Sequence, residues 1–208
     1  MKQWIDNGDL GQITKVTAFN CHHGALGDWF KAKPATPGED WNWMTSLKHS
    51  GVGAFGDLGT HALDILLWWL GEAKSVTAQI DTVTNRYGCD ESGQGLIRFA
   101  GGATGTLTAG WVDLADPVKY LVSGTKGLAA NISGKLFIAR DGQPFDLTKP
   151  ETDLPAAAPH AFELFLDAIN GKKTDVPLVT APEAAYRSAV MEAMYDGANA
   201  GTWVTPKK

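Results

Sequence analysis

Hydrophobic residues recur at every second position in the middle of the chain and at helical spacing on both sides of it. In the stretch SVTAQIDTVT the apolar residues Val76, Ala78 and Ile80 alternate with polar ones and share one face. The segments QGLIRFA, ATGTLTAGW, VKYLVSG, LAANIS and KLFIA continue as short strands with glycine-containing turns between them. The pattern predicts a meander-like antiparallel sheet, preceded by an earlier strand in ITKVTAFN.

A helical period appears on both sides of this sheet. Residues 60–70 are apolar on nearly every side and are followed by Gly71, which predicts a buried helix. Residues 2–8 are typical of the last turns of a helix. Near the other end, spacing of i, i+3, i+4 and i+7 predicts a helix containing Phe162, Phe165, Leu166 and Ile169.

The last helix is predicted from its start signal. Thr180 and Glu183 form a capping box, and Pro182 stands in the first turn. The stretch TWV at 202–204 predicts a short closing strand. Because helices and strands are segregated along the chain, the class is α+β: an open, mostly antiparallel sheet with helices on one face. We expect residues 1–208 to form a single domain.

Composition and charge exclude several classes of function. The 208 residues are 44% hydrophobic, enough for a sizeable core, and the net charge is −5 with no basic cluster longer than two residues. Nucleic acid and anionic membranes are therefore not expected as partners. The apolar run at 62–70 is about half of a bilayer crossing, so a cytoplasmic protein is expected, with Cys21 and Cys89 as free thiols.

The stretch GVGAFGDLGTHALD, residues 51–64, contains the spacing G-x-G-x-x-G. In a dinucleotide-binding loop a buried strand leads to the first glycine, and a helix starts at the last. The preceding residues, DWNWMTSLKHS, are polar and aromatic and do not form such a strand. The spacing therefore favours glycines that let the backbone pass close to a packed helix.

Asp57 and His61 are four residues apart and share one face of the helix. A carboxylate beside an imidazole suits a general base that removes a hydroxyl proton. The alternative is a helix cap with a hydrogen-bonded core histidine. Asp64 and His61 would make a metal pair, but no third ligand is close in sequence, so no metal site is predicted.

The order of these segments resembles the C-terminal domain of the Gfo/Idh/MocA oxidoreductases, the family of glucose-fructose oxidoreductase and inositol 2-dehydrogenase. KQWIDNGDLGQITKV is similar to the family's entry segment, and SGVGAFGDLGTHALDILLWWLGE is similar to its hallmark segment. RFAGGATGTLTAGW, YLVSGTKGLAANI and the two terminal helices also match. The resemblance implies a fold like the C-terminal domain of glyceraldehyde-3-phosphate dehydrogenase.

The resemblance also implies roles for single residues. His61 corresponds to the histidine of proton transfer and Asp57 to the carboxylate beside it, whereas Gly51 and Gly53 correspond to the glycine turn near the nicotinamide. The family's NAD(P)-binding Rossmann domain and its E-K-P segment have no counterpart in these residues. NAD or NADP is thus expected as the cofactor of the full-length enzyme, and no cofactor is expected to bind this chain alone.

Two functions remain open at this stage. One is the substrate-binding domain of an NAD(P)-dependent dehydrogenase for a sugar or cyclic polyol, inactive alone. Trp29, Trp41 and Trp43 are then candidate sugar-binding residues, although packing of their segment explains them equally well. The other is a stand-alone, non-catalytic module for sugar binding or dimerisation. In either case the uncovered sheet face predicts a homodimer or higher oligomer.

Overall fold

The structure is a computed structural model that describes residues 1–31, 41–173, 176 and 178–207. Its centre is one sheet of seven strands in the order β2-β3-β4-β1-β5-β6-β7. The strands are β1 (Ile13–Cys21), β2 (Ala73–Asp81), β3 (Ser92–Phe99), β4 (Thr104–Gly110), β5 (Val118–Gly124), β6 (Gly127–Ile132) and β7 (Lys135–Arg140). The predicted α+β class and mostly antiparallel sheet are confirmed.

The sheet is not a single meander, because the first strand is inserted in its middle. β1 pairs in parallel with β4 and antiparallel with β5. The meander therefore consists of two antiparallel halves, β2-β3-β4 and β5-β6-β7, which β1 joins. Periodicity could not predict this, because it shows that a strand exists but not which strands are its neighbours.

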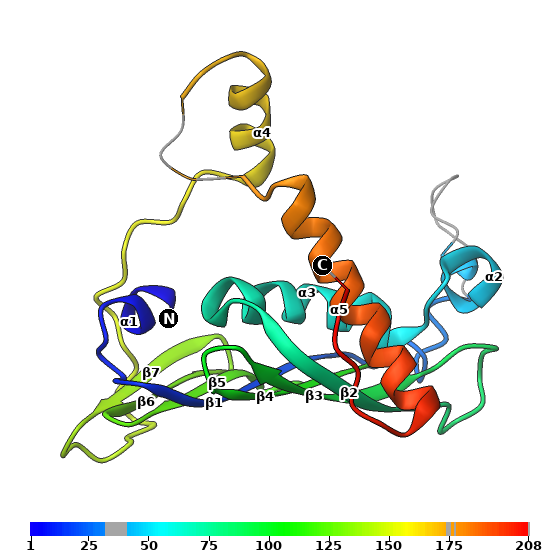
Figure 1. The fold of residues 1–208 in the computed structure, drawn as a ribbon, viewed down its shortest axis with the longest axis horizontal. Coiled ribbons are helices and arrows are strands. Elements are labelled where there is room, and N and C mark those ends of the chain that lie inside the picture. The colour runs from blue at the N-terminus through cyan, green and yellow to red at the C-terminus, as the bar shows by residue number, and fades with distance from the viewer. Residues whose placement is uncertain (32–40, 174–175, 177, 208) are drawn as a thin grey trace.

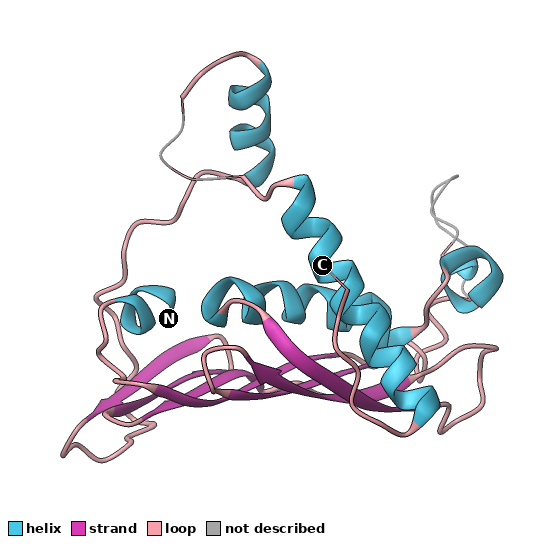
Figure 2. Cartoon of the chain, viewed as in Figure 1, coloured by secondary structure: helices cyan, strands magenta, loops and turns pink. Residues whose placement is uncertain are grey.

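The helices lie on one side of the sheet, as predicted (Figures 1 and 2). They are α1 (Lys2–Asp6), the 3₁₀ helix η1 (Asn42–Thr45), α2 (Leu47–Ser50), α3 (Ala54–Leu70), α4 (Ala161–Ile169) and α5 (Ala181–Ala200). α3 packs on β1 and β4, and α5 packs on β2 and on α3. Both members of the predicted capping box at Thr180 and Glu183 are present.

Two of the predicted elements differ in detail. α3 begins at Ala54 rather than at residue 60, so that Asp57 lies within its first turn. The predicted closing strand is reduced to one isolated bridge between Val76 and Val204. α3 is also less buried than expected, because Trp68 is mostly exposed on its outer face.

The main core fills the space between the sheet and its two long helices. Val16, Leu107 and Val122 come from the sheet, and Phe55 and Leu63 come from α3. α5 adds Val190, Ala193 and Met194. Burial of these apolar side chains fixes α3, the helix that carries Asp57 and His61, on the centre of the sheet.

Candidate active site on helix α3

The first turn of α3 is closed by the loop that precedes β3. The carboxylate of Asp90 accepts hydrogen bonds from the backbone N–H groups of Gly53 (3.0 Å) and Phe55 (2.8 Å). The Tyr195 hydroxyl accepts one from Gly56 (2.9 Å) and donates to Asp90 (3.1 Å), and the Ala54 N–H donates to the Asp90 carbonyl. The donors that a helix start offers to a pyrophosphate are thus already occupied.

The glycines of the motif have separate structural tasks. Gly51 ends α2 with φ +78°, a left-handed conformation that favours glycine, and it is exposed. Gly53 is buried, and a Cβ placed there would lie 2.4 Å from the Asp90 carbonyl oxygen. η1 and α2, not a strand, precede the motif. These observations agree with the rejection of a dinucleotide loop and explain why both positions are glycine.

Asp57 and His61 lie one turn apart on α3, but the carboxylate is oriented toward another partner. Oδ2 of Asp57 accepts a hydrogen bond from Nε1 of the fully buried Trp111, at 3.0 Å. His61 is exposed, and within the described ranges it has no hydrogen bond to Asp57. The histidine is therefore not a core residue, and its ring is accessible to a substrate from solvent.

Arg187 of α5 lies beside this stretch of α3. Its guanidinium donates to the Thr60 hydroxyl and forms an ion pair with Asp64, with 3.9 Å between Nε and Oδ1. A fixed positive charge therefore lies next to the residue preceding His61. The sequence pattern placed Arg187 in a helix but gave no sign of this contact, because the two helices are far apart along the chain.

His22, directly after β1, is a site residue that no pattern in the sequence indicates. Its Nδ1 accepts a hydrogen bond from the Gly24 N–H (2.9 Å), which leaves the proton of the neutral ring on Nε2. Burial lowers the pKa of His22, and the nearby negative charge of Asp57 acts in the opposite direction. The structure thus places the imidazole of His22 near Asp57, and burial favours the neutral form of this ring.

The three predicted tryptophans occupy different surroundings. Trp29 is about half exposed, and its ring lies 5.0 Å from that of His22 and 4.7 Å from that of His23, between centroids. Trp41 and Trp43, at η1, are also about half exposed. The structure therefore brings Trp29 to His22, whereas it shows no such contact for Trp41 and Trp43 among the described residues.

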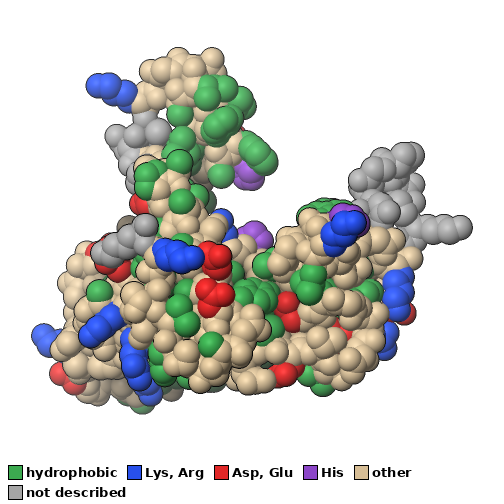
Figure 3. All heavy atoms as spheres, turned by 45° about the vertical axis from the view of Figure 1, so that its right-hand side comes forward, with side chains coloured by type: hydrophobic (Ala, Val, Ile, Leu, Met, Phe, Trp, Pro, Cys, Tyr) green, Lys and Arg blue, Asp and Glu red, His purple; other side chains and the backbone are tan. Residues whose placement is uncertain are grey.

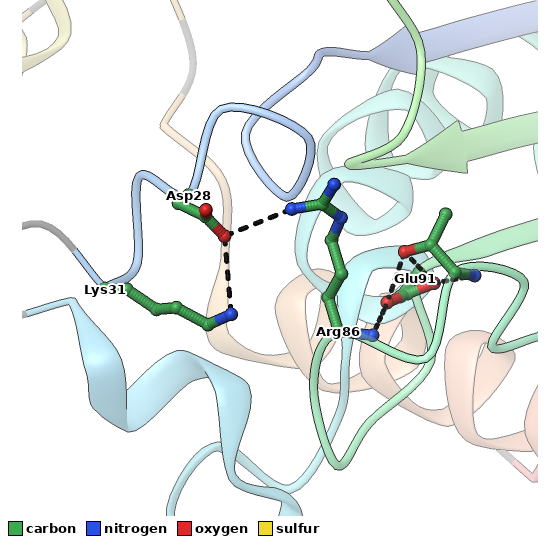
Figure 4. Close-up of polar contacts among 5 residues, drawn as sticks. Asp28, Lys31, Arg86 and Glu91 are labelled. Carbon is green, nitrogen blue, oxygen red and sulfur yellow. Dashed lines mark hydrogen bonds and ion pairs between the residues drawn. The ribbon is translucent and has the colours of Figure 1, made fainter.

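A polar network holds the Trp29 loop against the loop between β2 and β3 (Figure 4). Asp28 forms ion pairs with Arg86 (3.2 Å) and Lys31 (3.4 Å). The fully buried Glu91 accepts hydrogen bonds from the Arg86 N–H (2.7 Å) and from Thr84. The loop that carries Asp90 is thereby tied to the loop that carries Trp29.

Apolar contacts reinforce the same connection. Phe30 packs on Trp111, with centroids 4.4 Å apart, and on Tyr87. Cys21 and Cys89 are free and buried. Burial raises the pKa of Cys21 to about 12, so its thiol stays protonated and is not a nucleophile. In the described parts of the chain, no three His, Cys, Asp or Glu residues are grouped to hold a metal, and no helix is long and apolar enough to span a membrane.

Two surface hollows border α3 and the loop that closes its first turn. One hollow, of about 480 Å³, lies between α3 and the segment that leads into α5, and another of about 330 Å³ lies beside α2 and Asp90. Neither is lined by Asp57 or His61. A small molecule bound at His61 would therefore need a further wall to exclude water.

The fold is that of the C-terminal part of NAD-binding oxidoreductases. An NAD-binding oxidoreductase from Klebsiella pneumoniae matches 100% of this chain with 62% of its own, at a TM-score of 0.73 and 21% identity. An aldose-aldose oxidoreductase from Caulobacter crescentus, complexed with glycerol, matches 98% with 58% of its own, also at 0.73 and with 20% identity. At these identities the similarity establishes the fold.

Family membership comes from the sequence. Residues 1–130 match the GFO/IDH/MocA C-terminal domain, and the chain belongs to this family. Levoglucosan dehydrogenase from Pseudarthrobacter phenanthrenivorans is 25% identical over 131 residues, which are 63% of this chain and 31% of that protein. A solved levoglucosan dehydrogenase with NADH and levoglucosan gives a TM-score of 0.73 at 18% identity. The chain thus spans about three fifths of the solved relatives.

Proposed function

We propose that this chain is the substrate-binding domain of an NAD(P)-dependent oxidoreductase that acts on a sugar or cyclic polyol. The observation that carries the proposal is the exposed His61, one helical turn from an Asp57 whose orientation Trp111 fixes. Family membership and the levoglucosan complex of a relative support it.

In this proposal His61 accepts the proton of a substrate hydroxyl, and Asp57 stabilises the resulting positive charge through space. Arg187, held at Thr60 and Asp64, keeps a positive charge beside this stretch of α3. A bound nicotinamide would supply the hydride acceptor for the carbon that carries this hydroxyl. The amides at the start of α3 already donate to Asp90, so this helix start does not fit a pyrophosphate.

His22 and its neighbour Trp29 add contacts suited to binding a sugar at this site. Trp29 offers an apolar ring face to sugar C–H groups, and Nε2–H of His22 offers a hydrogen-bond donor. Asp57 lies near enough to His22 for its charge to act on the ring. His22 and Trp29 are therefore proposed as substrate-binding residues. Trp41 and Trp43 remain candidates for sugar binding because of their aromatic side chains, and Gly51 and Gly53 remain the positions that the resemblance implies near the nicotinamide.

A direct test uses the 208-residue chain. Levoglucosan, L-sorbose and inositol are titrated while the ring signals of the histidines are followed by NMR. Shifts at His61 and His22, with none at His49 on α2, are the expected result. No change at His61 up to about 100 mM ligand, far above millimolar affinities, would refute a sugar site here.

Catalysis is tested in a fusion of this chain to the NAD-binding portion of levoglucosan dehydrogenase. We expect His61→Asn to lower kcat for sugar oxidation by about 100- to 10,000-fold, the range that a general base contributes. His49→Asn is the matched control and should leave kcat unchanged. If the fusions bind the sugar but none of them oxidises it, a stand-alone sugar-binding module is favoured instead.

Self-association through the open sheet face is proposed separately. The side of the sheet away from α3 carries Thr17, Thr106, Gln94 and Leu96, and the hydroxyls of Thr17 and Thr106 are hydrogen-bonded at 2.9 Å. A strict monomer in light scattering at micromolar concentration would contradict this. Leu96→Glu, on β3 at this face, should weaken the oligomer.

A further inference from the structure

The imidazole of His22 is held by a hydrogen bond that only its neutral form can accept. Nδ1 of His22 accepts the backbone N–H of Gly24 at 2.9 Å, and the ring lies 5.0 Å from that of Trp29, between centroids. A Cβ placed on Gly24 would lie 2.6 Å from Cε1 of His22, so the ring lies directly against this backbone. A proton on Nδ1 would point at the Gly24 N–H. The hydrogen bond would then be lost, because two donors cannot pair.

The backbone of this loop is held independently of the His22 ring. The Ala25 N–H donates to the Trp111 carbonyl at 2.9 Å. Further along the loop, Asp28 forms its ion pair with Arg86 (Figure 4). Neither contact depends on the protonation of an imidazole. Loss of the hydrogen bond at Nδ1 would therefore free the ring of His22 rather than the whole loop.

The charged and titratable groups around His22 come from α3, from β5, from the segment between β4 and β5, and from its own loop. They are Asp57, Lys119, Asp116, His23 and Asp113, whose backbone N–H donates to the His22 carbonyl at 3.2 Å. Asp57 favours the charged ring, whereas His23 and Lys119 oppose it. Lys119 is itself paired with Asp116. Asp57 therefore supplies the strongest attraction for a protonated His22 ring.

Burial has the largest effect on His22 and lowers the pKa of its ring. Near neutral pH the ring is therefore neutral and keeps the hydrogen bond from the Gly24 N–H. Below the ordinary histidine pKa near 6.5, a ring released into water binds a proton more readily than the enclosed ring. Acid therefore favours release of the ring.

We infer that His22 is a pH-sensitive switch of the proposed sugar site. Protonation at Nδ1 frees the ring from Gly24 and Trp29, and the charged ring then pairs with Asp57. The inference rests on the proposed function, in which the same carboxylate supports His61. In the protonated state Asp57 is occupied by His22, and the indole face of Trp29 loses the Nε2–H donor beside it. Sugar should therefore bind more weakly in acid.

The first test needs no ligand. The ring signals of His22 and the amide signal of Gly24 are followed by NMR in the 208-residue chain between about pH 7.5 and pH 5, on either side of the ordinary histidine pKa. Relative to its intrinsic exchange rate at each pH, the Gly24 amide should lose protection more than about twofold and at most about 30-fold, the limit set by that pKa. Histidine side chains are exposed at the surface in Figure 3, and the exposed His49 on α2 is the internal reference. A Gly24 amide that keeps its protection over this range, whether or not the ring titrates, would overturn the switch.

Variants separate the switch from a simple loss of packing. In His22→Asn the side-chain oxygen accepts the Gly24 N–H at every pH, so protection should no longer depend on pH. His22→Phe has no acceptor, so the Gly24 amide should be unprotected throughout, and His23→Asn, at the exposed neighbouring residue, should behave like the unchanged chain. Asp57→Asn keeps an acceptor for Trp111 but removes the charge, so it should move the midpoint of the His22 titration to lower pH. An unmoved midpoint would overturn the pairing of the charged ring with Asp57.

The last test connects the switch to sugar binding. Levoglucosan is titrated into the chain and into His22→Asn at both ends of the pH range. Acid should weaken binding to the unchanged chain more than about twofold, and the variant should lose this pH dependence. An equal weakening in the variant would assign the effect to another group, such as His61, and would overturn the regulation by His22. Equal binding at both pH values would also overturn the regulation and leave the proposed function standing. A Gly24 amide that responds to pH in a chain that binds no sugar would refute the proposed function and leave the ring movement standing.

Discussion

Helices α3 and α4 are both apolar, yet their surroundings differ completely. Phe55 at the start of α3 is fully buried, and the first amides of this helix have acceptors in Asp90 and Tyr195. Phe162 at the start of α4 is 74% exposed, although His160 and Glu163 cap this helix as well. Local signals therefore make both helices, but the chain buries eight residues of α3 and only Leu164 of α4.

The sharpest contrast is between the two phenylalanines. Phe55→Ala should lower the free energy of unfolding by about 3–5 kcal/mol, because it leaves a cavity against Tyr195 and Met194 in the core. Phe162→Ala, the matched control, should change it by less than about 0.5 kcal/mol. Urea unfolding measures both. Equal losses in the free energy of unfolding of the two variants would contradict the difference between α3 and α4.

The next largest effect is expected at the carboxylate that closes α3. Asp90→Ala removes the acceptor of the Gly53 and Phe55 amides and of the Tyr195 hydroxyl. Leaving these partly buried donors unpaired should cost about 3 kcal/mol. Asp141→Ala, in the exposed turn after β7, is the control. If Asp90→Ala lowers the free energy of unfolding by less than the surface control Asp141→Ala, water satisfies these donors in place of Asp90.

A smaller effect is expected for the close approach at Gly53. Gly53→Ala places a Cβ 2.4 Å from the Asp90 carbonyl oxygen, so the backbone must shift, at about 2 kcal/mol. Gly88→Ala introduces the same methyl group where no atom lies within 4 Å, and it should be tolerated. Thermal unfolding of the two variants distinguishes steric conflict from the general effect of losing a glycine.

The smallest effect concerns pH and His22. Its pKa is lowered by burial, so below the ordinary pKa near 6.5 the unfolded chain binds more protons than the folded one. Stability should therefore fall as pH falls below about 6.5, with a slope of at most about 1.4 kcal/mol per pH unit from this group. His22→Asn should reduce this slope. Identical slopes in both proteins would show that His22 titrates as in the unfolded chain.

The candidate site divides into parts that the sequence could and could not predict. Spacing alone placed Asp57 and His61 on one helical face, and the polar residues before Gly51 argued against a dinucleotide loop. The contact of Asp57 with Trp111, the cap from Asp90 and the position of His22 were not predicted. Each depends on residues more than 30 positions apart, which periodicity does not relate.

By itself, the sequence determined the local elements: the period of two that forms the strands, the capping box at Thr180, and the apolar spacing of α4. Tertiary structure decided that β1 enters the middle of the sheet, that Asp90 closes the start of α3, and that the stripe of α4 is left uncovered. The physical reason is that backbone conformation and hydrophobic period are encoded within a few residues. Which apolar face is covered depends on the space that distant segments fill.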